Sequence, residues 1–479
     1  MSVDTLQARP RVLIPPAVLV LGGLLAANCA WSLVWPSAAT AVAAALLWAA
    51  AAWRLFGADA RAAVLLLPFM TLHLSVMVSL IAIESGAHMK EMGARGAASP
   101  ASALFALLSL AFLGTAAAMY IRRRSLRAAR GAAAPFSAAS PSPLLAWAAP
   151  GIAAPIVAYL ALTGLRNGFP LLEGIDRFQY RMNADVLTLN FLNLKFVIAA
   201  LLASGAAAAP GRALRAGHHL IFAAYLAVSF LFGDKFFIII AATCFYCMPF
   251  VLARPAGLAQ ALWRHAPLAI VALACVAGVT LFIYSGYGRF SLDTTLTRLG
   301  DRVAGQGQLW FLAVRDSSHW FGIDADGVAQ NLRSLFANPA ATYVFDHRIA
   351  AFYFVDKYAP ANLWASFLHN GGTVTPTMVF EAYGLVLFGY LGLVPALLLM
   401  GTLAGVVLEW LANAMQSGNP INALLPAFVA TQVLSVMSQG TLHSLLSLSA
   451  FKAYAAFLLL QWTVAECTRP GGLLREQRA

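Results

Sequence analysis

The chain has 479 residues, of which 61% are apolar and only 10% are charged. Because a soluble domain needs roughly a quarter of its residues charged to cover its surface, this composition excludes a soluble protein and requires lipid as the solvent. The net charge of +12 comes from basic residues in short gaps between apolar runs. No basic domain with interleaved aromatic residues exists, which argues against nucleic acid as a partner.

Apolar runs long enough to cross a bilayer, about 17 to 25 residues each, recur along the chain. They lie near residues 12–33, 38–56, 62–83, 101–121, 144–164, 187–206, 216–232, 236–253, 266–285, 377–403, 421–437 and 445–463. No small-residue cleavage site follows the first run, so it is interpreted as a span and not as a cleaved signal. We therefore expect an all-α polytopic membrane protein with about twelve transmembrane helices.

Charge is distributed unevenly between alternate gaps. About half of the 31 basic residues, including Arg122 and Arg130, fall in one set of gaps, together with only about a quarter of the 19 acidic residues. The positive-inside rule predicts that this set, and with it both termini, is cytoplasmic. The other gaps, including 84–100, 165–186 and the long segment 286–376, then face outward.

The resulting organisation has four parts. Residues 1–143 hold helices 1–4 and a basic cytoplasmic loop, 144–285 hold helices 5–9, 286–376 form a large outer loop, and 377–479 hold helices 10–12 and a tail. A loop of about ninety residues is usually functional. We expect the loop to be helical and to carry the active site.

The outer loop contains a candidate anion site. A helix predicted over about 294–313 places Arg298, Arg302 and Gln306 on one stripe, at i, i+4 and i+8. Two guanidinium groups one turn apart could grip a diphosphate through paired hydrogen bonds. The alternative is a solvated face in which Asp301 neutralises its neighbours.

Two short groups that combine a cation, a carboxylate and an imidazole follow in the same loop. They consist of Arg315, Asp316 and His319, and of Asp346, His347 and Arg348. A histidine beside cations suits a general base, although surface histidines are common.

The segment that enters the tenth predicted span carries a further candidate base. Thr375 and Pro376 are typical of a helix start, and the preceding Gly-Gly turn lets the backbone approach a ligand. Glu381 falls one to two turns inside the span, where an ionisable residue indicates function. The alternative is a buried glutamate paired with an arginine.

Two lysines sit close to apolar runs. Lys235 follows Asp234 between the seventh and eighth spans, where adjacent opposite charges could simply mark a turn. Lys195 is predicted inside the sixth span, which is costly unless it faces a cavity or reaches the interface.

Metal-binding patterns are weak. Asp324 and Asp326 form a D-x-D pair, but Asp-Ala-Asp-Gly is also ordinary turn chemistry, which we favour. Cys244 and Cys247 fall inside a predicted span without further ligands, so they are interpreted as small packing residues. We expect neither a metal nor a cofactor.

Four segments together resemble the Wzy-type oligosaccharide repeat-unit polymerases, relatives of the O-antigen ligases. The segments are Gly168-Phe-Pro170-Leu-Leu through Arg177 and Tyr180, Phe232-Gly-Asp-Lys-Phe, Arg302-Val-Ala-Gly-Gln-Gly-Gln-Leu-Trp310, and Gly372-Thr-Val-Thr-Pro376 running into Phe380-Glu-Ala-Tyr-Gly384, with Gly389 and Gly392 beyond. Their order and topology match along roughly residues 150–440.

The resemblance implies a membrane-embedded C-type glycosyltransferase fold in the bacterial inner membrane, metal-independent and inverting, that joins undecaprenyl-diphosphate-linked units at the periplasmic face. It implies that the diphosphate is held by Arg298, Arg302, Lys235, Arg177, Arg181 and Arg315, and that the base is Glu381, His347 or Asp316. Lys235 departs from the arginine that the family often has there, and a lysine supplies a point charge without the bidentate fork of a guanidinium. The implied partners are the lipid-linked oligosaccharide, membrane lipid and a chain-length regulator.

Two alternatives remain open at this point. A ligase that transfers a finished glycan onto lipid A core would use the same topology and similar arginines. A transporter or flippase would instead carry charges along a central path and have short outer loops, whereas here the charges gather in one long outer loop.

Overall fold

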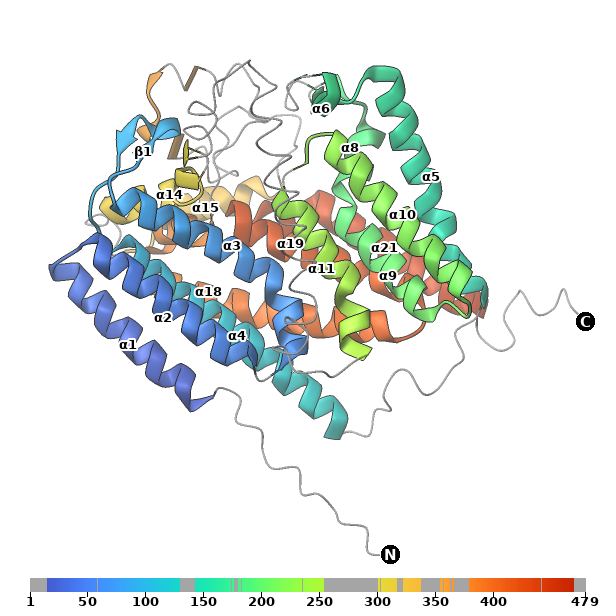
Figure 1. The fold of residues 1–479 in the computed structure, drawn as a ribbon, viewed down its shortest axis with the longest axis horizontal. Helices are drawn as coiled ribbons and strands as arrows, with labels where there is room; N and C mark the ends of the chain where they lie inside the picture. The colour runs from blue at the N-terminus through green and yellow to red at the C-terminus, as the bar shows by residue number, and fades with distance from the viewer. Residues whose placement is uncertain are drawn as a thin grey trace, which may run out of the picture.

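The computed structural model describes residues 15–57, 59–129, 143–173, 175, 180–181, 183–234, 236–253, 300–301, 303–316, 322–336, 354–355, 357–361, 364–365, 379–440 and 442–468 (Figure 1). These residues are almost all helical, which confirms the all-α prediction. One small exception is the antiparallel pair of strands β1 (His88–Met89) and β2 (Ala94–Arg95), with His88 opposite Arg95.

The helices of the first half are α1 (Pro16–Val34), α2 (Ala38–Gly57), α3 (Ala60–Glu84), η1 (Lys90–Met92), α4 (Ala101–Ala129), α5 (Pro143–Asn167), α6 (Pro170–Glu173), α8 (Val186–Asn193), α9 (Lys195–Ala208), α10 (Arg212–Leu231) and α11 (Phe236–Ala253). Those of the second half are α14 (Gln308–Arg315), α15 (Ala325–Ser334), α18 (Phe380–Gln416), η4 (Pro420–Ala423), α19 (Leu424–Gln439), α20 (His443–Leu446) and α21 (Leu448–Thr468).

In the described part of the chain, nine helices are long and apolar enough to cross a membrane. Helices α8 and α9 add a bent pair with an angle of 56° between them, which makes up to ten spans, and most of α11 forms a shorter apolar helix. The predicted span near 266–285 lies outside the described residues. The protein is therefore a multi-pass helical membrane protein, and the count of about twelve stays a prediction.

The helices form two groups that three others connect (Figure 1). Helices α1 to α4 pack against one another, and α5, α9 and α10 form the second group. Helix α11 packs against α9 on one side and α3 on the other, while α18 lies along α4 and α19 packs on both α18 and α9. Residues far apart in sequence are thereby brought into the same interior.

Helices α4 and α18 approach each other closely at two glycines of α18. A Cβ added at Gly401 would lie 2.7 Å from the Phe112 carbonyl oxygen, and one at Gly405 would lie 2.4 Å from the Ala116 carbonyl oxygen. The spacing is a G-x-x-x-G, which lets two backbones approach closely inside a membrane, where burial from water provides no driving force between helices.

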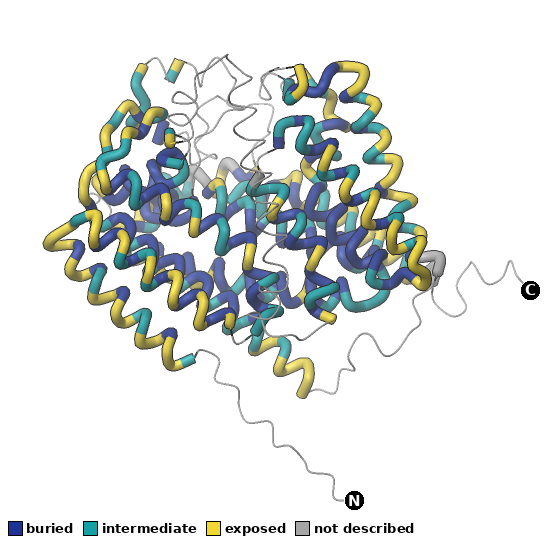
Figure 2. Tube along the Cα trace, viewed as in Figure 1, coloured by how far each residue is buried: buried dark blue, intermediate teal, exposed yellow. Residues whose placement is uncertain are grey.

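The outer helices carry many exposed residues, as Figure 2 shows for α1 and for the rim of the second group, and many of these residues are apolar. On α21, Leu459 and Trp462 are more than half exposed, and on α1 the same holds for Leu19 and Trp31. A soluble protein does not leave such surfaces to water. They are the surfaces that lipid covers.

The two ends of the bundle carry different elements. Strand β1 and helix α6 lie at the top of Figure 1, whereas the C-terminal end of α4 lies at the bottom. The gaps 84–100 and 165–186 therefore share one end, opposite the arginines of α4, as the charge pattern predicts.

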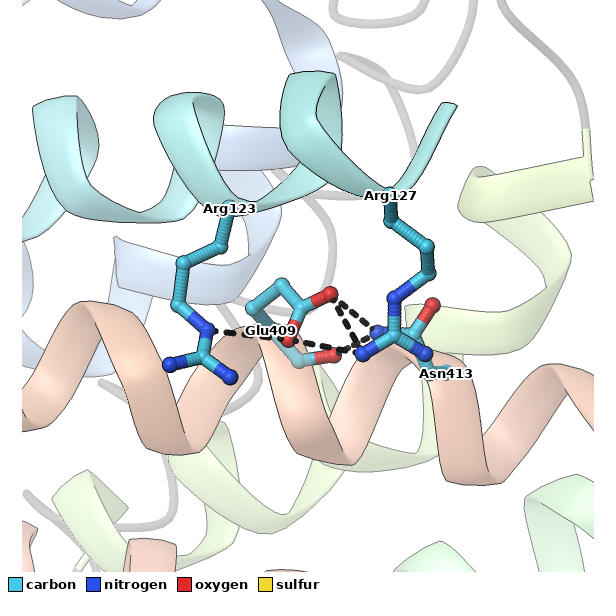
Figure 3. Close-up of polar contacts among 4 residues, drawn as sticks. All are labelled: Arg123, Arg127, Glu409 and Asn413. Atoms are coloured by element: carbon cyan, nitrogen blue, oxygen red, sulfur yellow. Dashed lines mark hydrogen bonds and ion pairs between the residues drawn. The ribbon is translucent and has the colours of Figure 1, made fainter. Parts of the chain in front are cut away.

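At the α4 end, a buried glutamate of α18 is fully surrounded by donors (Figure 3). Arg127 Nη2 lies 2.9 Å from Glu409 Oε1 and 3.2 Å from its Oε2, and Arg123 Nε lies 3.6 Å from Oε2. The Asn413 side-chain amide donates to Oε1 at 2.5 Å. This network attaches α18 to the basic end of α4.

Helix α18 is longer than the predicted span 377–403 because it continues to Gln416. At a rise of about 1.5 Å per residue its 37 residues exceed the roughly 30 Å of a hydrocarbon core. The helix is interrupted at Gly389, whose φ of 63° and ψ of −177° suit glycine alone. Residues 380–388 therefore form a separate first part, which carries Glu381.

Candidate functional site

Three charged side chains meet at the point where α8 and α9 break. Lys195, the first residue of α9, places its Nζ 2.8 Å from Asp234 Oδ2, and Arg181 Nη2 donates to Asp234 Oδ1 at 2.9 Å. The Lys195 and Asp234 side chains are almost fully buried. Charges can remain in such a place only when they are paired, because the desolvation cost of an isolated ion is several kcal/mol. We call these three residues the cation centre.

The cation centre carries an excess of positive charge. Two cations share one carboxylate, and the buried Nε of Arg181 makes no hydrogen bond within the described residues. The Arg181 side chain is still 35% exposed, so a ligand can reach it. A guanidinium with an unused donor beside a buried ammonium is suited to bind an anion.

Aromatic packing joins two of the resemblance segments around this centre. The rings of Phe169 and Tyr180 both contact Phe232, with centroids 5.4 Å and 5.5 Å away. Phe232 ends α10, and Gly233 follows with a φ of 84° that turns the chain toward Asp234. Phe169 and Tyr180 are therefore packed against the end of α10, although about fifty residues separate them from Phe232 in the sequence.

The start of α8 is fixed by hydrogen bonds to one carboxylate. Thr188 donates to Asp185 through its hydroxyl, at 2.6 Å, and through its backbone amide, at 2.8 Å, so Asp185 caps the helix. The Tyr159 hydroxyl of α5 donates to the same carboxylate at 3.0 Å. The hydrogen bonds from Thr188 lower the pKa of Asp185 below its usual range, which keeps this anchor ionised.

A second buried site joins α3 to the first part of α18. His73 Nε2 lies 3.0 Å from Glu381 Oε1, and both side chains are completely buried. The rings of Phe105 and Phe112 lie 5.6 Å from the His73 ring. Among the residues that the structure describes, His73 Nδ1 and Glu381 Oε2 have no hydrogen-bond partner. Glu381 is thus a buried acid with one occupied and one unoccupied oxygen.

The segment around Trp310 packs against this pair. Trp310 Nε1 donates to the Ala101 carbonyl oxygen at 2.8 Å, and its ring lies 6.0 Å from Phe105. Ser79 donates to the Ala304 carbonyl at 2.8 Å and accepts from the Gly307 amide at 2.8 Å. Helix α14 is therefore held on α3 and α4.

The predicted helix over 294–313 is wrong as a continuous element. Residues 305–307 form a turn, and α14 begins only at Gln308. Gly307 lies so close to α3 that a Cβ added to it would be 3.0 Å from Leu80 Cγ. This close approach favours a residue without a side chain. Gln306 lies in the turn, so the i, i+4, i+8 stripe is not a helical face.

Asp316 is in contact with several groups that reduce its suitability as a base. Lys357 Nζ lies 3.6 Å from its Oδ2 and Arg315 Nε lies 3.7 Å from its Oδ1, while the Tyr358 hydroxyl also donates to it. Arg315 ends α14, and His319 lies outside the described residues. The charges of Arg315 and Asp316 face each other.

Several predicted residues lie outside the described residues. They are Arg177, Lys235, Arg298, Arg302 and His347. Of the D-x-D pair, Asp324 caps α15 by accepting from the Gly327 amide at 2.9 Å, as expected for turn chemistry. Within the described residues no three His, Cys, Asp or Glu side chains are grouped as metal ligands.

Sequence reasoning missed His73 and the pairing of Lys195. His73 is an ionisable residue in the middle of the third predicted span, which is itself a signal of function. Lys195 was noted, but its partner Asp234 is 39 positions away and was interpreted as part of a turn. Only the bend between α8 and α9 brings the two together.

Comparison with known proteins gives one partial match. A family of unknown function (DUF6418) matches residues 345–453, less than half of the chain. The matched region includes Glu381 and all of α18. No curated protein and no solved structure matches the chain.

Proposed function

We propose that the protein is a bacterial inner-membrane glycosyltransferase that polymerises undecaprenyl-diphosphate-linked oligosaccharide units at the periplasmic face. The observation that supports this most directly is the cation centre. Its Arg181 and Lys195 come from separate elements, converge on one carboxylate and leave a net positive charge.

The cation centre suits a diphosphate leaving group. As the bond from the donor's anomeric carbon to the lipid diphosphate breaks, negative charge grows on the phosphate oxygens. Cations fixed in a poorly solvated place stabilise that charge more than water does, because they need no reorganisation. In this proposal Arg181 contacts the diphosphate, and the buried Lys195 stabilises its negative charge without touching it. Candidates for further contacts are Arg177, Lys235, Arg298, Arg302 and Arg315.

Glu381 is the preferred base among the candidates. It has an unoccupied buried oxygen, whereas Asp316 is already held by Arg315, Lys357 and Tyr358. A base has to accept the proton of the acceptor hydroxyl, so a carboxylate without cations around it is better suited. His347 remains an alternative base. Helix α11 packs against α9, which begins at Lys195, and against α3, which carries His73. One helix therefore connects the cation centre with the His73–Glu381 pair.

The proposal is tested with deletion and complementation. We expect the gene deletion to remove the long glycan ladder and to leave single lipid-linked units, and Arg181→Ala to slow chain growth by about 100-fold. Arg124→Ala is the matched control, because Arg124 also donates at 2.9 Å to an aspartate and is also 35% exposed, but lies on α4 and outside the cation centre.

Other outcomes separate the alternatives. Full-length polymer that persists on the polyprenyl lipid after deletion favours the ligase. An unchanged glycan profile contradicts both enzymatic proposals and favours a transporter. Equal effects of Arg181→Ala and Arg124→Ala contradict the role given to the cation centre.

A further inference from the structure

The His73–Glu381 pair lacks the complete hydrogen bonding that a purely structural contact between α3 and α18 would have. Its two groups share one contact at 3.0 Å, with both side chains fully buried, and one polar atom on each is unpartnered. Within the described residues, no other charged side chain contacts the pair. Polar atoms without partners in an apolar interior are costly and are found where function requires them.

The surroundings restrict what the pair can do. Phe69 contacts Phe112, and Phe105 and Phe112 both contact the His73 ring. Aromatic packing on this side fixes the imidazole plane and excludes water. An ionised Glu381 can only accept, so its contact with His73 Nε2 at 3.0 Å requires the tautomer that carries the proton on Nε2. That hydrogen bond restrains Oε1 and thereby limits rotation of the carboxylate.

We propose that His73 is a positioning residue that holds Glu381 Oε1 and so presents Oε2 as the atom that receives the proton of the acceptor hydroxyl. This role rests on the proposed glycosyltransferase function. His73 does not touch substrate; it acts through Glu381.

The proposed step is balanced. The acceptor O–H bond breaks, its proton moves to Glu381 Oε2, and the freed oxygen pair forms the new bond to the anomeric carbon. The bond from that carbon to the diphosphate oxygen breaks, and the lipid diphosphate leaves with its electron pair. His73 keeps its own proton on Nε2 throughout, so that its hydrogen bond to Oε1 is maintained.

The kinetic test compares His73→Phe, which keeps an aromatic ring without a donor, with His73→Gln, which keeps an N–H at similar reach. Full-length protein in lipid nanodiscs receives lipid-linked repeat units as substrate. We expect His73→Phe to lower kcat by about 100-fold with KM changed less than twofold, and His73→Gln to recover about tenfold of that loss. The solvent deuterium isotope effect on kcat should change in His73→Phe.

Wild-type kcat and isotope effect in His73→Phe would overturn the proposal. A loss of activity that equals the loss of folded protein, with normal turnover by the folded fraction, would also overturn it. That outcome would mean that His73 only holds α3 against α18.

An infrared measurement keeps the inference independent of the proposed reaction. A pH titration of the full-length protein should contain a carboxyl band that Glu381→Gln removes, that His73→Phe shifts, and that Glu409→Gln leaves in place. A Glu381 band that is the same in His73→Phe and in wild type contradicts the coupling. If the bands behave as expected while the wild-type protein joins no sugars, the proposed function fails and the pairing stands.

Discussion

Helix α18 carries two buried glutamates, and their surroundings are opposite. Glu409 receives Arg123, Arg127 and Asn413, so that both carboxylate oxygens are occupied (Figure 3). Glu381 contacts one imidazole nitrogen, and its Oε2 has no partner in the described part of the chain. The same residue type therefore has two settings on one helix: a compensated glutamate attaches α18 to α4, and an uncompensated one is the base that we propose.

The difference follows from position. Glu409 lies beside the end of α4, where the positive-inside pattern supplies arginines from the neighbouring helix. Glu381 lies on the other side of the break at Gly389, where it contacts His73 and no arginine of the described residues approaches it. The compensated glutamate thus lies on one part of the helix, and the base that we propose lies on the other.

The largest expected effect separates the two glutamates by rate. Glu381→Gln keeps a hydrogen-bonding group of the same size but cannot accept a proton, so we expect turnover to fall by a factor on the order of 100 to 10,000. Glu409→Gln should leave turnover within about twofold. Turnover of lipid-linked units by the purified variants measures both. Equal losses in the two variants would remove the distinction.

The next effect separates them by stability. Replacing both Arg123 and Arg127 by alanine leaves Glu409 buried without cations, which we expect to cost about 3 kcal/mol of apparent stability, less than a fully buried pair would because the arginines are nearly half exposed. Adding Glu409→Gln should restore most of that loss, since the orphaned charge is gone. Thermal melting in nanodiscs measures the series. Failure of the third substitution to rescue would show that the arginines act without Glu409.

Much of this architecture is predictable from the sequence, because lipid imposes a strong constraint. Apolar runs of span length have few alternatives to helices, so α1 to α4, α10 and α19 lie close to their predicted ranges. Charge asymmetry likewise placed the arginines of α4 opposite the gaps that contain β1 and α6.

The site is less predictable, because its contacts join distant residues. Nothing in the sequence near Lys195 identifies Asp234 as its partner, and nothing near Glu381 identifies His73, 308 positions away. The broken helix at Gly305–Gly307 was also missed, because helical spacing of Arg298, Arg302 and Gln306 was given more weight than the two glycines.

A smaller effect tests whether the break in α18 at Gly389 sets the position of Glu381 relative to His73. Gly389 has backbone angles that an alanine adopts only with strain, so Gly389→Ala should cost about 2 kcal/mol and lower turnover by moving Glu381 relative to His73. Gly23→Ala in α1 is the control, because an added Cβ there meets nothing within 4 Å. Thermal melting and turnover are measured together. Unchanged turnover in Gly389→Ala would mean that the break does not position Glu381.

The smallest effect tests how completely Glu409 is compensated. Asn413 donates to Glu409 Oε1 at 2.5 Å and to the Glu409 carbonyl at 2.6 Å, but Oε1 also receives Arg127. Removing the amide with Asn413→Ala should therefore cost only about 1 kcal/mol, because a charged donor remains on the same oxygen. Thermal melting measures the change, and in the Arg127→Ala background the same substitution should cost more, since the last close donor to Oε1 is then lost. Equal costs in both backgrounds would mean that Arg127 and Asn413 do not compensate for each other, and that the Glu409 end is no more redundant than the Glu381 end.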